Sequence, residues 1–292
     1  MSHKSGFVAI VGKPNAGKST LMNAFLGQDL TMVNPKAQTT RHRIKGILNG
    51  DDYQVIFSDT PGVIEPIYKL HEKMMGAVNA AFEDADVLLY ITEIADLKLD
   101  DLTKAKLTGS DVPLFVVLNK VDVSNQEQID KAIAHWQETL NPEHIFPVSA
   151  LRNFYLDVLL KHILEKLPEG PAYFDKDDSL SDRDTRFFVE EIIRERILSF
   201  YQKEIPYSVE VKVMQYKESE DIDRIYVTLF VTRESQKIIL LGKGGAAIKK
   251  LGTESRKKIE AVVNKKVFLE LTVKVEDNWR DDERQLKRFG YE

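Results

Sequence analysis

The sequence contains no cysteine among its 292 residues. Disulfide bonds and thiolate metal sites are therefore excluded, and a reducing, cytoplasmic environment suits this composition. The chain also lacks any apolar run near the roughly 20 residues that a membrane-spanning helix needs. The apolar stretch Phe7–Val11 is too short for the core of a signal peptide. We expect a cytoplasmic protein, and the sequence leaves open a peripheral contact of part of it with a membrane.

An excess of charge of one sign is also lacking, because the formal net charge is only −5. This value conceals a difference between two parts of the chain. Residues 1–182 carry 18 Lys and Arg against 26 Asp and Glu, whereas residues 183–292 carry 23 against 20. Such a small positive excess does not predict nucleic-acid binding by itself, so a local basic cluster would have to provide it. The length suits two domains of ordinary size.

The pattern of apolar residues changes once along the chain. Up to residue 168, apolar runs alternate with helical segments, which predicts an α/β domain whose mostly parallel sheet has helices on both faces. Residues 169–182 contain one proline, one glycine and several acidic residues, and are predicted to form a linker. Residues 183–292 follow the order helix, strand, strand, helix, helix, strand, which predicts a separate α+β domain with a short helical tail. The strands predicted in the first domain are Phe7–Val11, Ile44–Leu48, Gln54–Ser58, Val87–Thr92, Pro113–Asn119 and His144–Val148.

A glycine-rich loop follows the first predicted strand. Its sequence, Gly12-Lys13-Pro14-Asn15-Ala16-Gly17-Lys18-Ser19, matches the P-loop pattern G-x-x-x-x-G-K-[ST]. In such a loop the backbone N–H groups and the start of the next helix surround phosphates. Lys18 would reach the β- and γ-phosphates, and the Ser19 hydroxyl would bind Mg²⁺. The predicted nucleotide-binding residues of this loop are Gly12, Lys13, Pro14, Asn15, Ala16, Gly17, Lys18, Ser19 and Thr20.

Two further stretches supply groups for the triphosphate. Asp59-Thr60-Pro61-Gly62 ends an apolar strand, where Asp59 can hold Mg²⁺ through water and the Gly62 N–H can reach the γ-phosphate. The polar stretch 29–43 is predicted to be a switch loop that triphosphate orders and hydrolysis frees. Within it, Thr40 is the favoured ligand of Mg²⁺ and the γ-phosphate, and Thr39 is the alternative. The predicted metal ligands are Ser19, Thr40 and Asp59, and the predicted catalytic residues are Lys18, Thr40 and Gly62.

Two motifs at the ends of later strands predict recognition of guanine. Asn119-Lys120-Val121-Asp122 places a carboxylate where it can accept two N–H groups of guanine, a pair that adenine lacks. Lys120 would pack along the ring. Ser149-Ala150-Leu151 ends the last strand, where the Ala150 N–H can meet the guanine carbonyl. All these motifs follow strands at their carboxyl ends, where open α/β sheets bind ligands. The predicted guanine-side residues are Asn119, Lys120, Asp122, Ser149, Ala150 and Leu151.

A second glycine-rich loop, Gly242-Lys243-Gly244-Gly245, lies between two predicted helices of the C-terminal domain. It fits the GxxG loop with which KH domains clamp a nucleic-acid backbone. The pattern alone is weak, because generic glycine turns are more frequent, but basic residues cluster in and after it. The alternative for the helix lysines is a solvated face. The predicted RNA-binding residues are Gly242, Lys243, Gly244, Gly245, Lys249 and Lys250.

The segments GKPNAGKST, KAQTTRHRI, DTPG, NKVD and SAL resemble the motifs of the translation-factor-like class of bacterial GTPases. With the second domain included, nearly the whole chain resembles the Era family. The resemblance implies a GTPase domain at 1–168, a linker at 169–182 and a type II KH domain at 183–292. It also implies Mg²⁺-dependent hydrolysis of GTP to GDP by a monomer that binds the 3′ end of 16S rRNA. Such a protein would assist assembly of the small (30S) ribosomal subunit and leave after hydrolysis.

The sequence departs from that family pattern at several positions. Ala16 replaces a usual valine, and 151–155 is bulkier than usual, which affects packing of the two loops. Val63 stands where many signalling GTPases have a glutamine that orients water, and valine cannot hydrogen-bond a water molecule. Asn15 matches the position that binds K⁺ in some relatives, where the cation would mimic an arginine finger. The alternative is that Asn15 only braces the loop.

Two other functions compete with that of a ribosome-assembly GTPase. A regulatory switch for the cell cycle or a membrane surface, without a ribosomal target, would be marked by a lipidation site or a basic amphipathic anchor, and the sequence shows neither. A plain RNA-binding protein with an inactive GTPase domain conflicts with the intact Lys18, Ser19, Asp59 and Asp122. A related family with two GTPase domains is excluded because the P-loop pattern occurs once.

Overall fold

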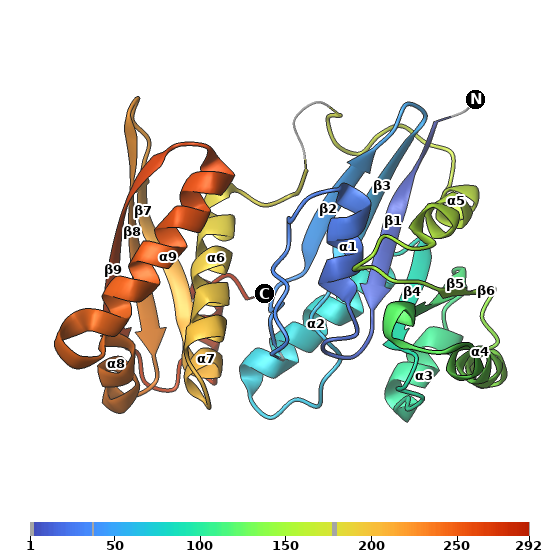
Figure 1. Cartoon of the computed structure of the whole chain (residues 1–292), viewed down its shortest axis with the longest axis horizontal. Coiled ribbons are helices and arrows are strands. Elements are labelled where there is room, and N and C mark those ends of the chain that lie inside the picture. The colour runs from blue at the N-terminus through green and yellow to red at the C-terminus, as the bar shows by residue number, and fades with distance from the viewer. Residues whose placement is uncertain (1–2, 37, 177–179, 292) are drawn as a thin grey trace. The chain divides into compact units, whose positions relative to one another are not determined.

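The computed structural model describes residues 3–36, 38–176 and 180–291 (Figure 1). Residues 177–179 of the predicted linker and Ala37 of the predicted switch loop therefore lie outside the described part. Contacts divide the chain into two units, one comprising Met1–Glu65 with Met74–Asp182 and the other Pro66–Lys73 with Arg183–Glu292. In the described part, no helix combines the length and apolar character that spanning a membrane requires.

The first unit is built on a six-stranded sheet in the order β2-β3-β1-β4-β5-β6. The β2–β3 pair is antiparallel and the four other described pairs are parallel, so the predicted mostly parallel sheet is confirmed. The chain order explains this arrangement, because crossover helices lie between the parallel strands. The strands are β1 (Lys4–Val11), β2 (Ile44–Asn49), β3 (Tyr53–Asp59), β4 (Val87–Glu93), β5 (Leu114–Asn119) and β6 (His144–Pro147).

Helices cover both faces of this sheet. Alternate residues of β1, such as Ala9 and Val11, join a core with Trp136 and apolar residues from three of the helices, α2, α3 and α4. On the opposite face, Phe25 of α1 stacks on Phe57 of β3 with ring centroids 4.8 Å apart. The helices are α1 (Lys18–Leu26), α2 (Lys69–Glu83), α3 (Asp101–Thr108), α4 (Gln126–Leu140) and α5 (Leu156–Lys166). Because the strands are buried on both faces, their sequences read as continuous apolar runs.

The segment after α5 pairs with the first unit along its sheet. The buried Gln54 side chain accepts the N–H groups of Tyr173 and Phe174 at 2.7 and 2.9 Å. Further on, the Ile47 N–H of β2 donates to Leu180 O at 3.0 Å, and Ser181 Oγ donates to Lys45 O at 2.7 Å. The predicted linker thus hydrogen-bonds to this unit at several of its described residues, and Leu180 and Ser181 lie along the edge strand β2.

The second unit contains a three-stranded sheet in the order β7-β8-β9. β7 (Glu210–Lys217) and β8 (Ile222–Val231) are antiparallel, and β9 (Lys266–Val275) is parallel to β8. Helices α6 and α9 contact each other and one face of the sheet (Figure 1). The predicted order of helices and strands is found, with a short additional helix after α6. The helices are α6 (Thr185–Phe200), α7 (Ile205–Ser208), α8 (Glu234–Leu241), α9 (Ala246–Val263) and α10 (Glu283–Arg288).

Candidate functional site: a nucleotide pocket and a nucleic-acid groove

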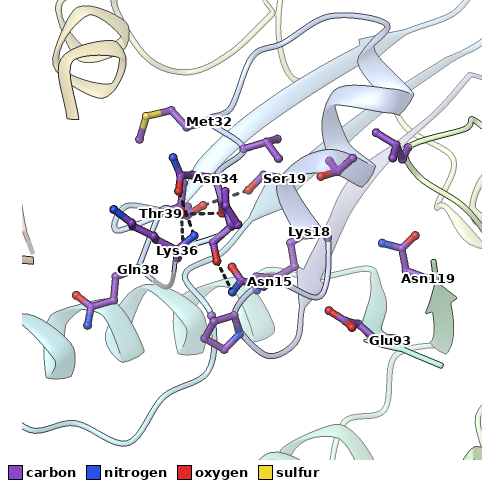
Figure 2. Close-up of a pocket in the computed structure, with 18 of the residues that line it drawn as sticks. Asn15, Lys18, Ser19, Met32, Asn34, Lys36, Gln38, Thr39, Glu93 and Asn119 are labelled. Atoms are coloured by element: carbon purple, nitrogen blue, oxygen red, sulfur yellow. Dashed lines mark hydrogen bonds between the residues drawn. The ribbon is translucent and has the colours of Figure 1, made fainter. Parts of the chain in front are cut away.

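The first unit has a cavity of about 570 Å³ at the carboxyl ends of its parallel strands. Figure 2 shows Lys18, Ser19 and Asn119 among its lining side chains, together with residues of the predicted switch loop. The sheet topology brings the residues after these strands together, because β1, β3 and β5 all run toward the same edge of the sheet. The lining residues are Pro14, Asn15, Gly17, Lys18, Ser19, Thr20, Met32, Val33, Asn34, Pro35, Lys36, Gln38, Thr39, Thr40, Gly62, Glu93, Asn119, Lys120 and Leu151.

The P-loop turns tightly at Gly17, the residue that precedes α1. Its φ of +106° lies in a region that favours glycine, and a Cβ there would approach Asn119 Nδ2 to 2.1 Å. Asn119 Nδ2 instead donates to Ala16 O at 2.9 Å. The close approach therefore ties the phosphate loop to the end of β5, which carries the predicted guanine motif.

Lys18 is buried at the base of the cavity. Its Nζ donates to Gly12 O at 3.0 Å and to Lys13 O at 2.8 Å. Burial lowers the pKa of this ammonium to about 8, and the nearby Asp59 carboxylate opposes that shift. Both hydrogen-bond partners are neutral carbonyls. The buried ammonium is therefore suited to an anion such as a phosphate.

Ser19, Thr40 and Asp59 form a cluster of oxygen atoms beside Lys18. Ser19 Oγ donates to Asp59 Oδ2 at 2.6 Å and lies 3.2 Å from Thr40 Oγ1. Thr40 Oγ1 also reaches Asp59 Oδ2 at 3.5 Å. Hydroxyl and carboxylate oxygens are the ligands that Mg²⁺ prefers, so this donor set fits the predicted metal. The side chains come from three segments far apart in the sequence.

The two threonine candidates make different contacts. Thr39 Oγ1 donates to Lys36 O at 2.6 Å and so braces the predicted switch loop internally. Thr40 is the residue whose hydroxyl joins Ser19 and Asp59. The sequence favours Thr40, but two adjacent threonines have the same chemistry, and only the course of the loop distinguishes them.

The predicted guanine motifs hydrogen-bond to each other. Ser149 Oγ donates to Asp122 Oδ1 at 2.6 Å and thereby orients the carboxylate. The Ala150 N–H donates to Asn119 Oδ1 at 3.0 Å. Leu151 lines the cavity, whereas Asp122, Ser149 and Ala150 are not among the lining residues. This network holds the segments after β5 and β6 in one arrangement.

Two acidic residues of this region were missed in the sequence. Glu93, the last residue of β4, lines the cavity and forms an ion pair with Lys120. Asp96, just beyond it, pairs with Lys13 at 2.8 Å, so the Lys13 side chain is not among the cavity lining. The position of Glu93 at the carboxyl end of a strand was a usable signal. The partner of Lys13 is 83 residues away and left no local signal.

The second unit places the GxxG loop between α8 and α9. Gly242, Gly244 and Gly245 all have positive φ, which explains the glycine content of this turn. Beside it, α9 and β9 border a hollow of about 410 Å³ whose lining includes Lys249 and Arg256. Lys257 and Lys258 form ion pairs with Glu254 and Glu195, which reduces the charge that they can offer to RNA. Lys250 lies over the Phe200 ring at 5.0 Å.

The fold and the two sites define a class of protein, namely a P-loop GTPase domain joined to a KH domain. Residues 7–120 match the family described as a 50S ribosome-binding GTPase, and residues 204–280 match the KH domain family. The chain is 43% identical over 296 residues to the GTPase Era of Caldicellulosiruptor saccharolyticus, covering 100% of this chain and 98% of that protein. It is 45% identical to the chloroplastic GTPase ERA1 of Zea mays, covering 99% and 71%.

Solved structures agree with this assignment. A crystal structure of Era in complex with MgGDPNP and nucleotides 1506–1542 of 16S ribosomal RNA superposes with a TM-score of 0.94, at 35% identity and 99% coverage of both chains. A single-residue variant of Aquifex aeolicus Era bound to GDP·AlF4⁻ gives a TM-score of 0.92 at the same identity and coverage. The chain belongs to the Era family of GTPases. The predicted fold class and GTP-hydrolysing activity are confirmed.

Proposed function

We propose that this protein is a GTP-driven switch that binds the 3′ end of 16S rRNA through its KH domain. In this role it assists assembly of the 30S subunit and leaves after hydrolysis. The contacts of the Thr40 hydroxyl with Ser19 and Asp59 are the observation that supports a switch. A residue of the 29–43 loop thereby reaches the phosphate end of the pocket, so the conformation of this loop can depend on the γ-phosphate.

The pocket residues divide the work of binding and hydrolysis. Lys18 would contact the β- and γ-phosphates, and the Gly62 N–H would face the γ-phosphate. Ser19 and Thr40 would hold Mg²⁺ directly, with Asp59 acting through water. When bound, Mg²⁺ would neutralise charge that develops on the phosphate oxygens. Asp122, oriented by Ser149, would accept the guanine N–H groups and exclude adenine.

Positioning of the attacking water is incomplete within the pocket. Val63 carries no polar side-chain atom, and its N–H donates to Gly12 O at 3.1 Å. This residue therefore stabilises the P-loop and cannot orient a nucleophile through its side chain. We expect slow hydrolysis by the protein alone and acceleration when another group orders the site.

We propose K⁺ as one such group, bound at Asn15. Asn15 lines the cavity, and its Nδ2 donates to Pro35 O of the switch loop at 2.8 Å. Its amide oxygen would be a cation ligand beside the phosphates. Replacing K⁺ with Na⁺ should slow hydrolysis in the wild type, and N15A should remove the difference between the two salts. Equal wild-type rates in K⁺ and Na⁺ would exclude this site, while an equal loss in both salts for N15A would assign Asn15 a bracing role.

In-cell crosslinking with sequencing of the bound RNA tests the proposed function. We expect the sequencing reads to concentrate at the 3′ end of the small-subunit rRNA. These reads should increase in the K18A variant, in which hydrolysis is blocked. The fraction of K18A protein that binds GTP is measured in parallel. The matched control is a KH-domain variant, G244D, which should lose this peak. Reads spread evenly over cellular RNA, or recovery of the protein mainly with membranes, would contradict the proposal.

A further inference from the structure

The sheet of the KH domain has an outer face, opposite α6 and α9, whose two ends differ. At one end, Phe289 covers Phe230 with ring centroids 5.0 Å apart and also contacts the buried Trp279. At the other end, the outer face carries Arg224 and Tyr226 of β8 and Phe268 of β9. We call these three residues the aromatic patch. Alternation along the strands places them there, since Ile225, Val227 and Val267 belong to the core.

The patch residues contact one another and are accessible. Phe268 is 41% exposed, so its ring is open to solvent. Its ring centroid lies 6.1 Å from that of Tyr226, and the Arg224 guanidinium lies 5.6 Å from it. Strand register explains the grouping, because Arg224 is directly opposite Phe268. Aromatic rings and guanidinium planes are the groups on which proteins stack unpaired bases.

The patch is continuous with the groove beside the GxxG loop. β9 is an edge strand, and the hollow between α9 and β9 is lined by residues from both faces of that strand. Leu269 and Leu271 face α9, whereas Phe268 and Glu270 face outward. A strand of RNA in the groove would therefore pass the edge of β9 and meet Phe268 next.

The side chains around the patch carry charges of both signs. Lys217 of β7 is directly opposite Arg224, so two cations lie side by side at this end of the sheet. Glu270 is opposite Tyr226 and opposes them. The adjoining hairpin between β7 and β8 adds the carboxylates of Glu218, Glu220 and Asp221, so the patch has no excess of positive charge. Base stacking, and not attraction of the RNA backbone, would then be the main contribution to binding.

We propose that Phe268, Tyr226 and Arg224 form a stacking site for an unpaired base of single-stranded RNA, adjoining the four nucleotides that a GxxG loop clamps. This inference rests on the proposed RNA-binding function. It extends the binding surface from the helical side of the KH domain around the edge of β9.

A double-mutant cycle between protein and RNA tests the stacking site. The full-length protein is titrated, by fluorescence anisotropy, with a single-stranded RNA of about ten nucleotides and with versions that carry one abasic position each. In the wild type, one abasic position outside the clamped tetranucleotide should weaken binding about tenfold, a typical loss for one stacked base. In F268A, the intact RNA should bind about tenfold more weakly, and that same abasic position should cause no further loss.

Matched variants separate stacking from folding. F268Y keeps an aromatic ring and should bind like the wild type, and T272A changes an exposed residue of the same strand and face outside the patch. The stacking site would be overturned if every abasic RNA lost the same affinity for the wild type and for F268A. Unchanged affinity of F268A for the intact RNA would also overturn it. If the wild type binds none of these RNAs, the proposed function itself fails. Loss of affinity in G244D but not in F268A would retain the proposed function and reject only the patch.

Discussion

K18A should lower the rate of GTP hydrolysis by at least about 10²-fold, because preorganised charges of this kind supply several kcal/mol to the transition state. Lys18 is a buried ammonium held by two backbone carbonyls at the phosphate end of the cavity. The lowered pKa, about 8, means that it is charged in the free protein below that pH. Removing it would leave the negative charge that develops on the phosphates without this ammonium group. Single-turnover hydrolysis at saturating GTP measures the effect on the chemical step.

Lys13 provides the matched control within the same loop. Its side chain pairs with Asp96 at 2.8 Å and does not line the cavity. We therefore expect K13A to retain hydrolysis within a few fold of the wild type, since exposed ion pairs contribute at most about 1 kcal/mol. Near-normal turnover in K18A, or an equal loss in the two variants, would show that the phosphate contacts are assigned to the wrong lysine.

G244D should abolish binding of a single-stranded rRNA 3′-end fragment and leave guanine-nucleotide binding intact. Gly244 has a φ of +60°, and no atom lies within 4 Å of the position that a Cβ would take. The fold should tolerate the change, because aspartate adopts this backbone region more readily than most residues. The added carboxylate would instead face the RNA phosphates that the loop is built to approach.

G244N separates the charge from the side-chain volume. Asparagine has nearly the same size and the same tolerance of positive φ, so both variants should unfold at similar temperatures. RNA affinity should fall further in G244D than in G244N. Anisotropy titrations with RNA, run beside nucleotide binding, give both quantities. Unchanged RNA affinity in G244D would mean that this loop is only a turn and that RNA binds elsewhere.

Local motifs carried most of what the sequence could predict. The P-loop, the residues after β3 and the guanine motifs are short segments whose chemistry is read from a few adjacent residues. Strand positions followed from buried apolar runs. The start of α3 is set by a capping residue and not by the apolar pattern. The Asp100 side chain accepts the Thr103 N–H at 2.8 Å and caps the helix, which begins at Asp101.

Contacts between distant segments could not be predicted from one sequence. The pairing of Lys120 with Glu93, and of Lys13 with Asp96, depends on strand order in the sheet. The aromatic patch likewise depends on the register of β8 with β9, which sets residues of two separate strands side by side. The same holds for residues 169–182. Their composition predicts a linker, but it does not indicate that the buried Gln54 side chain accepts the N–H groups of Tyr173 and Phe174.

The hydrogen bonds between the end of the linker and β2 affect where the GTPase domain can be separated from the rest of the chain. β2 is the last strand on its side of the sheet, and an uncovered edge presents free N–H and C=O groups that recruit other strands. Leu180 and Ser181 occupy part of this edge through their bonds to Ile47 and Lys45. A domain cut after residue 168 would expose β2 and would tend to self-associate, whereas one continued to residue 182 keeps its own edge protection. Residues 180 and 181 therefore belong with the GTPase domain whenever that domain is studied alone.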